Sequence, residues 1–331
     1  MSSKPRILTG DTPTGRLHLG HWVGSVKRRV ELQSTHDCHF IIANYHAFTT
    51  RSERSAEIRS DCLEIVRDYL AMGIDPERAT VFLQSEIPAI HELCFLFAML
   101  LPFNRVMRNP TLKDEIRVKD LGETYSFGFP LYAVGQCSDI LTFRPVGVPV
   151  GEDQVPHLEL AREVVRRFHH FYGEVFVEPQ PLLTPTPRLP GLDNRKMSKS
   201  YGNTIDLSDD ADAVTKKVRQ MYTDPKRIRA DIPGTVEGNP VFMYHDAFNT
   251  DTAEVDDLKA RYREGKVGDV EVKTKLAKAM NAMLEPMRER RREVAANPGR
   301  VREIVVEGSR KARTIAHATM ERVRDAVKLR Y

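Results

Sequence analysis

Three short apolar runs in the first 84 residues constrain the fold most strongly. They cover residues 5–8, 38–44 and 80–84, and the second run, C-H-F-I-I-A-N, is rich in Ile and Phe. Runs of this length and composition suit strands that are covered on both faces. Because these runs alternate with helix-like segments, the chain is predicted to be an α/β protein with a doubly wound parallel sheet.

The segments between the predicted strands have helical periodicity. The first extends from His18 to about Gln33, and the second ends near Gly73. The apolar face of the second helix consists of Ile58, Cys62, Ile65, Val66 and Tyr69. The spacing of Thr50 and Glu53 predicts a capping box at its start.

The character of the chain changes after Asn203. Helical patterns cover residues 209–222, 254–262, 272–292 and 301–329, and no strand run is convincing there. The proline-rich stretch P-Q-P-L-L-T-P-T-P-R-L-P, residues 179–190, suits a boundary. We therefore predict a Rossmann-like α/β domain over residues 1–190 and a smaller all-α domain over 191–331. The apolar face of the last helix packs either on its own domain or back on the first one.

Composition narrows the protein class. A chain of 331 residues that is 41% apolar can form two packed units. Its start lacks an apolar signal segment, and its longest apolar run, residues 93–101, is about half as long as a membrane span, so we expect a cytoplasmic protein without membrane contact. The four cysteines form no C-x-x-C pair, which predicts neither a metal site nor a disulfide framework.

Basic residues are concentrated near the C-terminus. Residues 285–331 carry 13 Lys and Arg against 7 Asp and Glu, although the whole chain has a formal charge of only +4. Such a segment can neutralise the phosphates of a nucleic acid, but most segments of this kind are simply solvated helix faces. Charge alone leaves both interpretations open.

Two short motifs suggest phosphate chemistry. In H-L-G-H, residues 18–21, the two histidines are three positions apart and would share a helix face, while Gly20 would let a ligand approach the backbone. In K-M-S-K-S, residues 196–200, two lysines on a loop could follow negative charge onto a leaving pyrophosphate. Each motif alone also suits ordinary surface structure. Neither a Walker A loop nor G-x-G-x-x-G is present.

Together, the two motifs resemble the ATP-binding signatures of the class I aminoacyl-tRNA synthetases. The resemblance implies that His18, His21, Lys196 and Lys199 are catalytic, with ATP and its Mg²⁺ as cosubstrate. It also implies an ATP site that comprises Thr12, Pro13, Thr14, Gly20, His21, Gly151, Glu152, Asp153, Leu189, Lys196, Met197, Ser198, Lys199 and Ser200. It further implies a dimerisation insertion in the first domain, anticodon binding by the second, and a homodimer that binds tRNA.

Three further blocks resemble the tryptophanyl-tRNA synthetases, a family within this class. They are N-Y-H-A-F-T (44–49), Y-A-V-G-Q-C-S-D-I-L (132–141) and V-P-V-G-E-D-Q-V-P-H-L-E-L-A-R (148–162). This resemblance implies L-tryptophan and tRNA(Trp) as substrates, with Asp139 accepting the indole N–H. The other implied tryptophan-binding residues are Leu8, Gly10, His46, Tyr132, Gln136, Val148, Val150 and Gln154.

Other functions remain open at this stage. Thr12 and Gln136 depart from residues common in bacterial members of the family. Tyr132, Gln136 and Asp139 also match the Y-x-x-x-Q-x-x-D spacing of tyrosyl-tRNA synthetases, so tyrosine is the alternative substrate. A small nucleotidylyltransferase or a non-catalytic, RNA-binding descendant of a synthetase would represent other classes.

Overall fold

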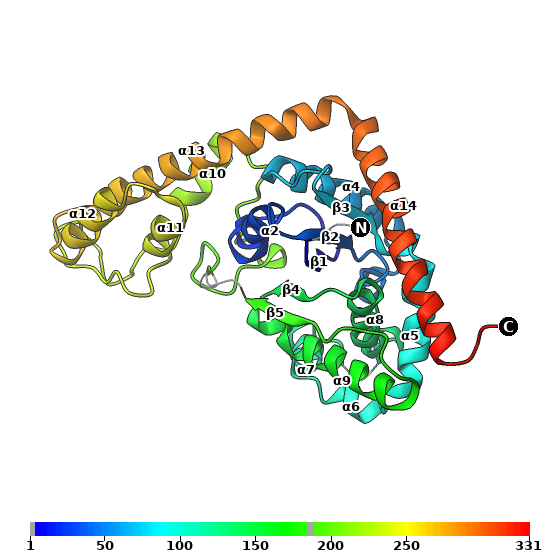
Figure 1. The fold of residues 1–331 in the computed structure, drawn as a ribbon. Coiled ribbons are helices and arrows are strands. Elements are labelled where there is room, and N and C mark those ends of the chain that lie inside the picture. Colours follow the sequence, from blue (N-terminus) through cyan, green and yellow to red (C-terminus); the bar gives the residue numbers. More distant parts are fainter. Residues whose placement is uncertain (1–3, 123, 184–188) are drawn as a thin grey trace. The chain divides into compact units, whose positions relative to one another are not determined.

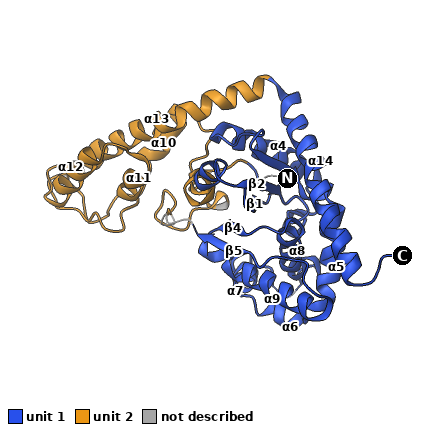
Figure 2. Ribbon diagram, in the orientation of Figure 1, with its two compact units in different colours: residues 1–15, 27–185, 297–331 blue, residues 16–26, 186–296 orange. Residues whose placement is uncertain are grey.

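The computed structural model describes residues 4–122, 124–183 and 189–331, without the side chain of Ser200. By their contacts the described residues divide into two compact units (Figure 2). Unit 1 takes those within 1–15, 27–185 and 297–331, and unit 2 those within 16–26 and 186–296. The predicted domain boundary between residues 190 and 191 stays a prediction, and residues 184–188 of the proline-rich stretch lie outside the described residues.

Unit 1 contains a five-stranded parallel sheet with the order β3-β2-β1-β4-β5 (Figure 1). Its strands are β1 (Arg6–Asp11), β2 (Asp37–Ile42), β3 (Ala79–Leu83), β4 (Gly147–Val150) and β5 (Gln180–Leu183). The order of the strands reverses between β1 and β4, which is where sheets of this type bind ligands. The predicted doubly wound α/β fold is confirmed.

The three predicted strand runs coincide with β1, β2 and β3, but the sequence did not reveal β4 or β5. Both of these strands contain a proline, and proline cannot donate to a strand ladder. Pro181 is tolerated because β5 is an edge strand. The carbonyl of Pro149 in β4 accepts a hydrogen bond from Thr9 Oγ1 at 2.9 Å, which links β4 to β1.

Helices surround the sheet in unit 1. They are α2 (Lys27–Leu32), α3 (Phe48–Arg51), α4 (Ser55–Met72), α5 (Pro88–Leu100), α6 (Phe103–Met107), α7 (Pro110–Val118), α8 (Gly128–Phe143), α9 (Val155–Tyr172) and α14 (Pro298–Ala326). The predicted capping box is wrong. Helix α4 begins only at Ser55, no side chain caps it, and Thr50 lies in the separate helix α3.

Unit 2 is helical in its described residues. Its elements are α1 (Leu19–His21), a π-helical turn (Trp22–Val26), α10 (Ala211–Arg219), α11 (Pro240–Phe248), α12 (Thr252–Arg263) and α13 (Asp269–Ala296). Helix α13 packs against α10 and α11. The helices predicted after Asn203 are confirmed, and α11, which begins at Pro240, was not predicted.

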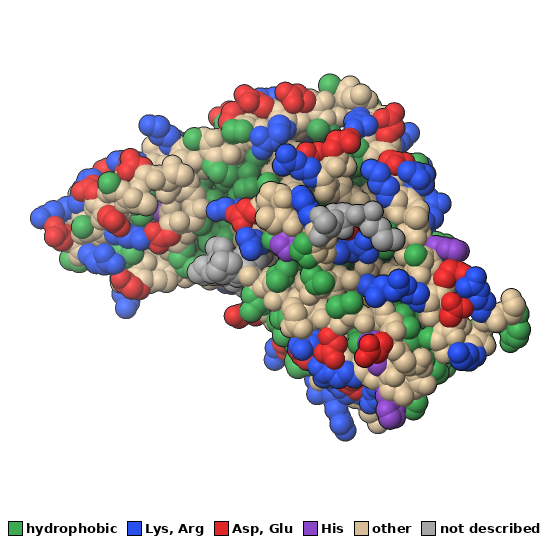
Figure 3. Space-filling view, viewed as in Figure 1, with side chains coloured by type: hydrophobic (Ala, Val, Ile, Leu, Met, Phe, Trp, Pro, Cys, Tyr) green, Lys and Arg blue, Asp and Glu red, His purple; other side chains and the backbone are tan. Residues whose placement is uncertain are grey.

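Two surface properties bear on the predicted partners. Among the described residues, no helix has both the length and the apolar character that crossing a bilayer requires. On the face drawn in Figure 3, basic and acidic side chains are interspersed. Many basic residues of the described chain are in ion pairs, such as Arg261 with Glu271 and Arg324 with Glu92.

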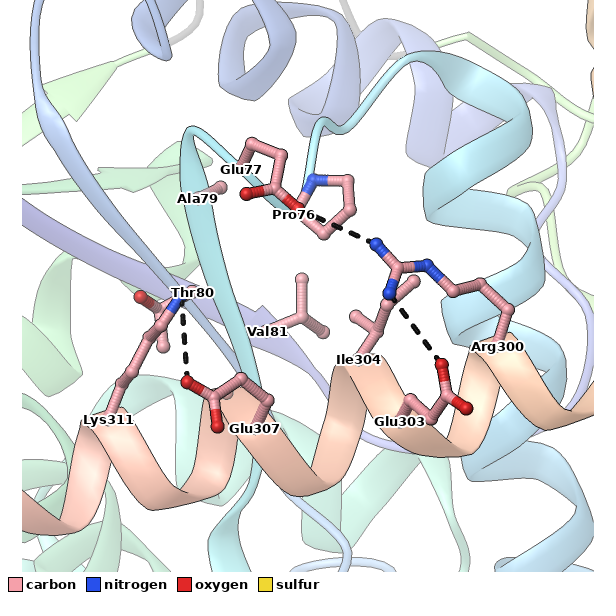
Figure 4. A pocket seen from close by; sticks show the side chains of 11 residues that line it. Pro76, Glu77, Ala79, Thr80, Val81, Arg300, Glu303, Ile304, Glu307 and Lys311 are labelled. Carbon is pink, nitrogen blue, oxygen red and sulfur yellow. Dashed lines mark ion pairs between the residues drawn. The ribbon is translucent and has the colours of Figure 1, made fainter.

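Helix α14 lies directly against the edge strand β3. A Cβ atom on Gly308 would lie only 1.9 Å from the Val81 carbonyl oxygen, so the helix can approach this closely only with glycine there. Beside it, Ser309 Oγ accepts a hydrogen bond from the Leu83 N–H at 3.3 Å, so the helix supplies the edge strand with an acceptor. The shallow pocket between helix and strand is lined by charges that are already paired, Arg300 with Glu77 and Glu303, and Lys311 with Glu307 (Figure 4).

We expect Gly308→Ala to destabilise the protein by about 1–3 kcal/mol, because the added methyl group must displace either the helix or the strand backbone. Urea unfolding, followed by circular dichroism, measures this change. Gly299→Ala in the first turn of α14 is the matched control, because its Cβ meets only an ordinary contact at 3.5 Å. Equal stability of the two variants would contradict the tight contact.

Candidate active site

The H-L-G-H and K-M-S-K-S segments lie in the same unit, and backbone pairing joins residues 17–19 to residues 205–207, a few positions after the second segment. The Leu19 N–H donates to the Ile205 carbonyl at 3.0 Å, and the Leu207 N–H donates to the Leu17 carbonyl at 3.0 Å. A Cβ atom on Gly20 would lie 2.8 Å from Met197 Sδ. The structure therefore brings together two motifs that are about 180 residues apart in the sequence.

The two histidines cap the start of α1 reciprocally. His18 Nδ1 accepts from the Gly20 N–H at 3.2 Å, and His21 Nδ1 accepts from the His18 N–H at 3.1 Å. Their ring centroids are 3.9 Å apart. Because Nδ1 is an acceptor in both rings, each neutral imidazole carries its proton on Nε2, the atom that can donate to a phosphate oxygen.

Asn203, which is buried, fixes the backbone of the K-M-S-K-S segment. Its side-chain oxygen accepts from the Ser198 N–H at 2.8 Å, and its Nδ2 donates to the Lys196 carbonyl at 3.1 Å and to Asp193 at 2.8 Å. Lys196 is exposed, and Met197, Ser198 and Lys199 are half-buried. Leu189, the first described residue of the segment 186–296, is buried.

A buried ion pair fixes the end of β1, where the following loop begins. The Asp11 carboxylate accepts from Arg29 at 2.7 Å and from the Tyr69 hydroxyl, and both of these side chains are buried. Arg51 donates to the Pro13 carbonyl at 2.7 Å. These contacts fix the segment Thr12–Thr14 at the carboxyl end of β1.

Helix α8 presents one polar face. Tyr132, Gln136 and Asp139 follow one another at intervals of four and three residues and so share a side of the helix. Gln136 Nε2 donates to Gln154 Oε1 at 3.4 Å, and the Tyr132 hydroxyl lies 3.3 Å from His157 Nε2. The structure thus places these predicted residues in one cluster.

Asp139 is a carboxyl group with few partners. It is 4% exposed, and burial raises its pKa to about 8. Its hydrogen bonds within the described chain come from Gln84 Nε2, at 2.8 Å to Oδ1 and 3.0 Å to Oδ2. An acid in this state has acceptor capacity for a ligand donor.

Two imidazoles next to this cluster are neutral. Burial lowers the pKa of His46 to about 4, and it lowers the pKa of His157 likewise to about 4. His46 follows β2 and faces α8, where a Cβ on Gly135 would lie 3.0 Å from its Nε2. The pocket therefore contains no histidine charge near neutral pH.

The remaining predicted residues belong to the strands and their ends. Leu8 in β1 and Val148 in β4 are buried core residues, and Val150 packs at the border of the same core. Gly10 lies tightly against β2, because a Cβ there would be 1.8 Å from the Ile41 carbonyl oxygen. After β4, Gly151 precedes the short helical turn Glu152–Gln154, which Thr111 Oγ1 holds by a 2.6 Å hydrogen bond to the Asp153 carbonyl.

Sequence reasoning assigned no role to several residues of these clusters, among them Gln84, His157 and Asn203. Gln84 gave the clearest signal, since it is a polar residue at the carboxyl end of a predicted buried strand. His157 and Asn203 lie inside quoted motifs or beside them, but only their hydrogen bonds single them out. Among the described residues, no group of three or more His, Cys, Asp or Glu is arranged to hold a metal ion.

The fold and these clusters define a nucleotide-dependent enzyme of the class I synthetase type. The sequence model of the family described as tRNA synthetases class I (W and Y) matches residues 1–285, and the chain belongs to this family. It is 52% identical to the tryptophan–tRNA ligase of Treponema pallidum over 98% of this chain and 97% of the relative, and 46% identical to that of Chlamydia caviae over 99% and 97%. It also resembles the structure of tryptophanyl-tRNA synthetase from Campylobacter jejuni complexed with ADP and tryptophan, with a TM-score of 0.86, 31% identity and coverage of 98% and 99%.

We expect Asp139→Asn to stabilise the unliganded protein, because the amide removes a buried acid that must ionise as pH rises. The folded state holds the proton up to about pH 8, whereas an unfolded Asp loses it near 3.8. Wild-type stability should therefore fall relative to the variant by about 1.4 kcal/mol per pH unit between these pH values and stay several kcal/mol lower above pH 8. Unfolding with urea at several pH values measures the difference, and a difference independent of pH would contradict the raised pKa.

Proposed function

We propose that this chain is a tryptophan–tRNA ligase, which activates L-tryptophan with ATP and transfers it to the 3′ end of tRNA(Trp). Asp139 carries the proposal, because it is a buried acceptor with a single neutral donor. The indole N–H is a donor without acceptor capacity and so complements this group. The names of the T. pallidum and C. caviae relatives and the tryptophan in the C. jejuni structure support the same substrate.

The first step needs no nucleophile from the protein. A carboxylate oxygen of tryptophan attacks the α-phosphorus of ATP, and the bond to the oxygen that bridges to the β-phosphate breaks, which releases pyrophosphate. The Nε2–H groups of His18 and His21 donate hydrogen bonds to phosphate oxygens. Lys196 and Lys199 neutralise the charge that moves onto pyrophosphate. Mg²⁺ arrives as part of the ATP substrate.

The other site residues receive roles by position. Tyr132, Gln136 and Gln154 hold the amino and carboxyl groups of tryptophan, and His46 faces its ring. Leu8, Gly10, Val148 and Val150 supply the apolar walls. The ATP contacts are Thr12, Pro13 and Thr14, the ribose segment Gly151, Glu152 and Asp153, the adenine neighbours Gly20, Leu189 and Met197, and the loop residues Ser198 and Ser200.

The second step requires tRNA, and the family implies a homodimer. The 3′-terminal ribose hydroxyl attacks the carbonyl carbon of the adenylate, and AMP leaves. Phe95, Met99 and Phe103 are 69%, 65% and 57% exposed, and the first two share one face of α5, which suits a second copy of the chain. We place the enzyme in the cytoplasm, where tRNA is charged.

Tyrosine is the second candidate substrate. Tyr132, Gln136 and Asp139 share one face of α8, and a phenol can also donate to Asp139. We rank it second because a phenol oxygen additionally needs a donor, whereas the neighbouring His46 Nε2 receives one hydrogen bond from Gln84 and so acts as an acceptor.

We expect tryptophan-dependent exchange of pyrophosphate into ATP to exceed tyrosine-dependent exchange by at least about 100-fold in kcat/KM. His21→Ala and Lys199→Ala should each lower kcat by about 10²–10³, because each removes a donor to the transition state. Faster exchange with tyrosine would overturn the substrate assignment. No exchange with any amino acid would favour the RNA-binding descendant, and adenylate transfer to another acid would favour a nucleotidylyltransferase.

We expect charge removal at Arg290, Arg291 and Arg292 together, as a triple Ala variant, to weaken tRNA charging by about tenfold or more while tryptophan activation is unchanged. These residues lie near the end of α13, and the triple Lys variant, which keeps the charge, is the control. Aminoacylation measured at two salt concentrations should show a smaller salt dependence for the Ala variant. Loss of both activities would indicate structural damage instead.

A further inference from the structure

Gln84 connects the ends of two neighbouring strands. It follows β3, is 1% exposed, and its Oε1 accepts from the Tyr45 N–H at 3.1 Å. Because that N–H can only donate, the amide is oriented with its NH₂ group away from Tyr45. Next to it, Asn44 and Ser85 exchange two further hydrogen bonds, at 2.8 and 3.0 Å, which fix the same two segments to each other.

The NH₂ group of Gln84 meets two residues of the proposed pocket. It donates to both carboxylate oxygens of Asp139, and it lies 3.1 Å from His46 Nε2. Since His46 Nε2 accepts this bond, the imidazole proton is on Nδ1. His46 Nε2 is 3.6 Å from Asp139 Oδ2 and carries no proton that it could donate there.

We propose that Gln84 is a positioning residue for substrate specificity, which orients Asp139, limits its protein donors and thereby reserves it as the acceptor for a ligand N–H. This inference rests on the proposed function. Gln84 does not itself touch the ligand in this assignment. It acts through Asp139 and through the tautomer of His46.

The charge state of Asp139 gives the proposal a distinctive readout. Burial raises the pKa of Asp139, and the hydrogen bonds from Gln84 lower it. The titratable groups around Asp139 are His46, Cys94 and Cys137, and burial keeps the thiols protonated by raising their pKa. Without Gln84, Asp139 should ionise only at higher pH.

The test compares pyrophosphate exchange by wild type and Gln84→Met between pH 6.5 and 9.5. In wild type, kcat/KM for tryptophan should rise with pH and level off near pH 8. In Gln84→Met, the KM for tryptophan should increase about 10- to 100-fold at pH 7.5. The bend, which is the pH at which kcat/KM levels off, should move to higher pH. The KM for ATP should change by less than about threefold.

Gln33→Met is the matched control. Gln33 is also a buried glutamine of unit 1, but within the described residues its hydrogen bonds are to the backbone of Val30, Gly73 and Asp75. This variant should lose stability without a change in the KM for tryptophan or in the bend. If Gln84→Met does not fold, Gln84→Glu keeps the size and the acceptor for Tyr45, and it should shift the bend upward even further.

The proposal is overturned if a folded Gln84 variant keeps the wild-type KM for tryptophan and the wild-type bend. It is also overturned if both change equally in Gln33→Met, since the effect would then reflect general loss of packing. Absence of tryptophan-dependent exchange in wild type would refute the proposed function itself, and is thus distinguishable from failure of this inference.

Discussion

Parallel pairing of the five strands is the constraint on which the proposed tryptophan site depends. It directs the carboxyl ends of β1, β2, β3 and β4 to one edge of the sheet, so the residues that follow each strand become neighbours. His46 follows β2, Gln84 follows β3 and Gly151 follows β4. Helix α8 then adds a polar face that carries Tyr132, Gln136 and Asp139. The parallel register of the strands therefore brings residues from distant parts of the sequence to one cluster.

In unit 2, the H-L-G-H and K-M-S-K-S motifs are far apart in the sequence. Backbone pairing between residues 17–19 and 205–207 brings them together, as strand pairing does for the cluster of unit 1. Small residues permit the remaining contacts. Gly20 leaves space for Met197, and Gly191 leaves space for the Asn203 amide, which would lie 2.2 Å from a Cβ there. The two lysines consequently extend from a loop whose backbone is fixed, Lys196 as an exposed side chain and Lys199 as a half-buried one.

The sequence predicted β1, β2 and β3, the later helices and the two motifs of unit 2, since each has a periodic or highly specific pattern. It did not predict β4 and β5, because Pro149 and Pro181 argue against strands unless their neighbours are known. The prediction of a capping box at Thr50 and Glu53 was wrong because helix α4 begins only after these residues, at Ser55. Gln84 and Asn203 could not be assigned roles, because the hydrogen bonds of one buried amide side chain leave no periodic pattern in the sequence. The same holds for Gly308, whose need for close approach to β3 is visible only in three dimensions.

In the proposed site, selectivity between indole and phenol depends on which hydrogen bonds Asp139 and His46 can accept and donate. Both rings offer one donor, but a phenol oxygen also accepts, and it would be stabilised by a protonated carboxyl or a protonated imidazole. Burial keeps His46 neutral, and Gln84 turns its Nε2 into an acceptor, so His46 offers no donor. Asp139 can donate to a phenol oxygen only while it holds its proton, below about pH 8. Docking of a donor-only group favours the ionised form of Asp139, so binding of an indole releases the proton that burial holds there. In the proposed site, a phenol gains the same bond to an ionised Asp139 but leaves its own oxygen without a donor from Asp139 or His46, so the preference for an indole should increase as Asp139 ionises.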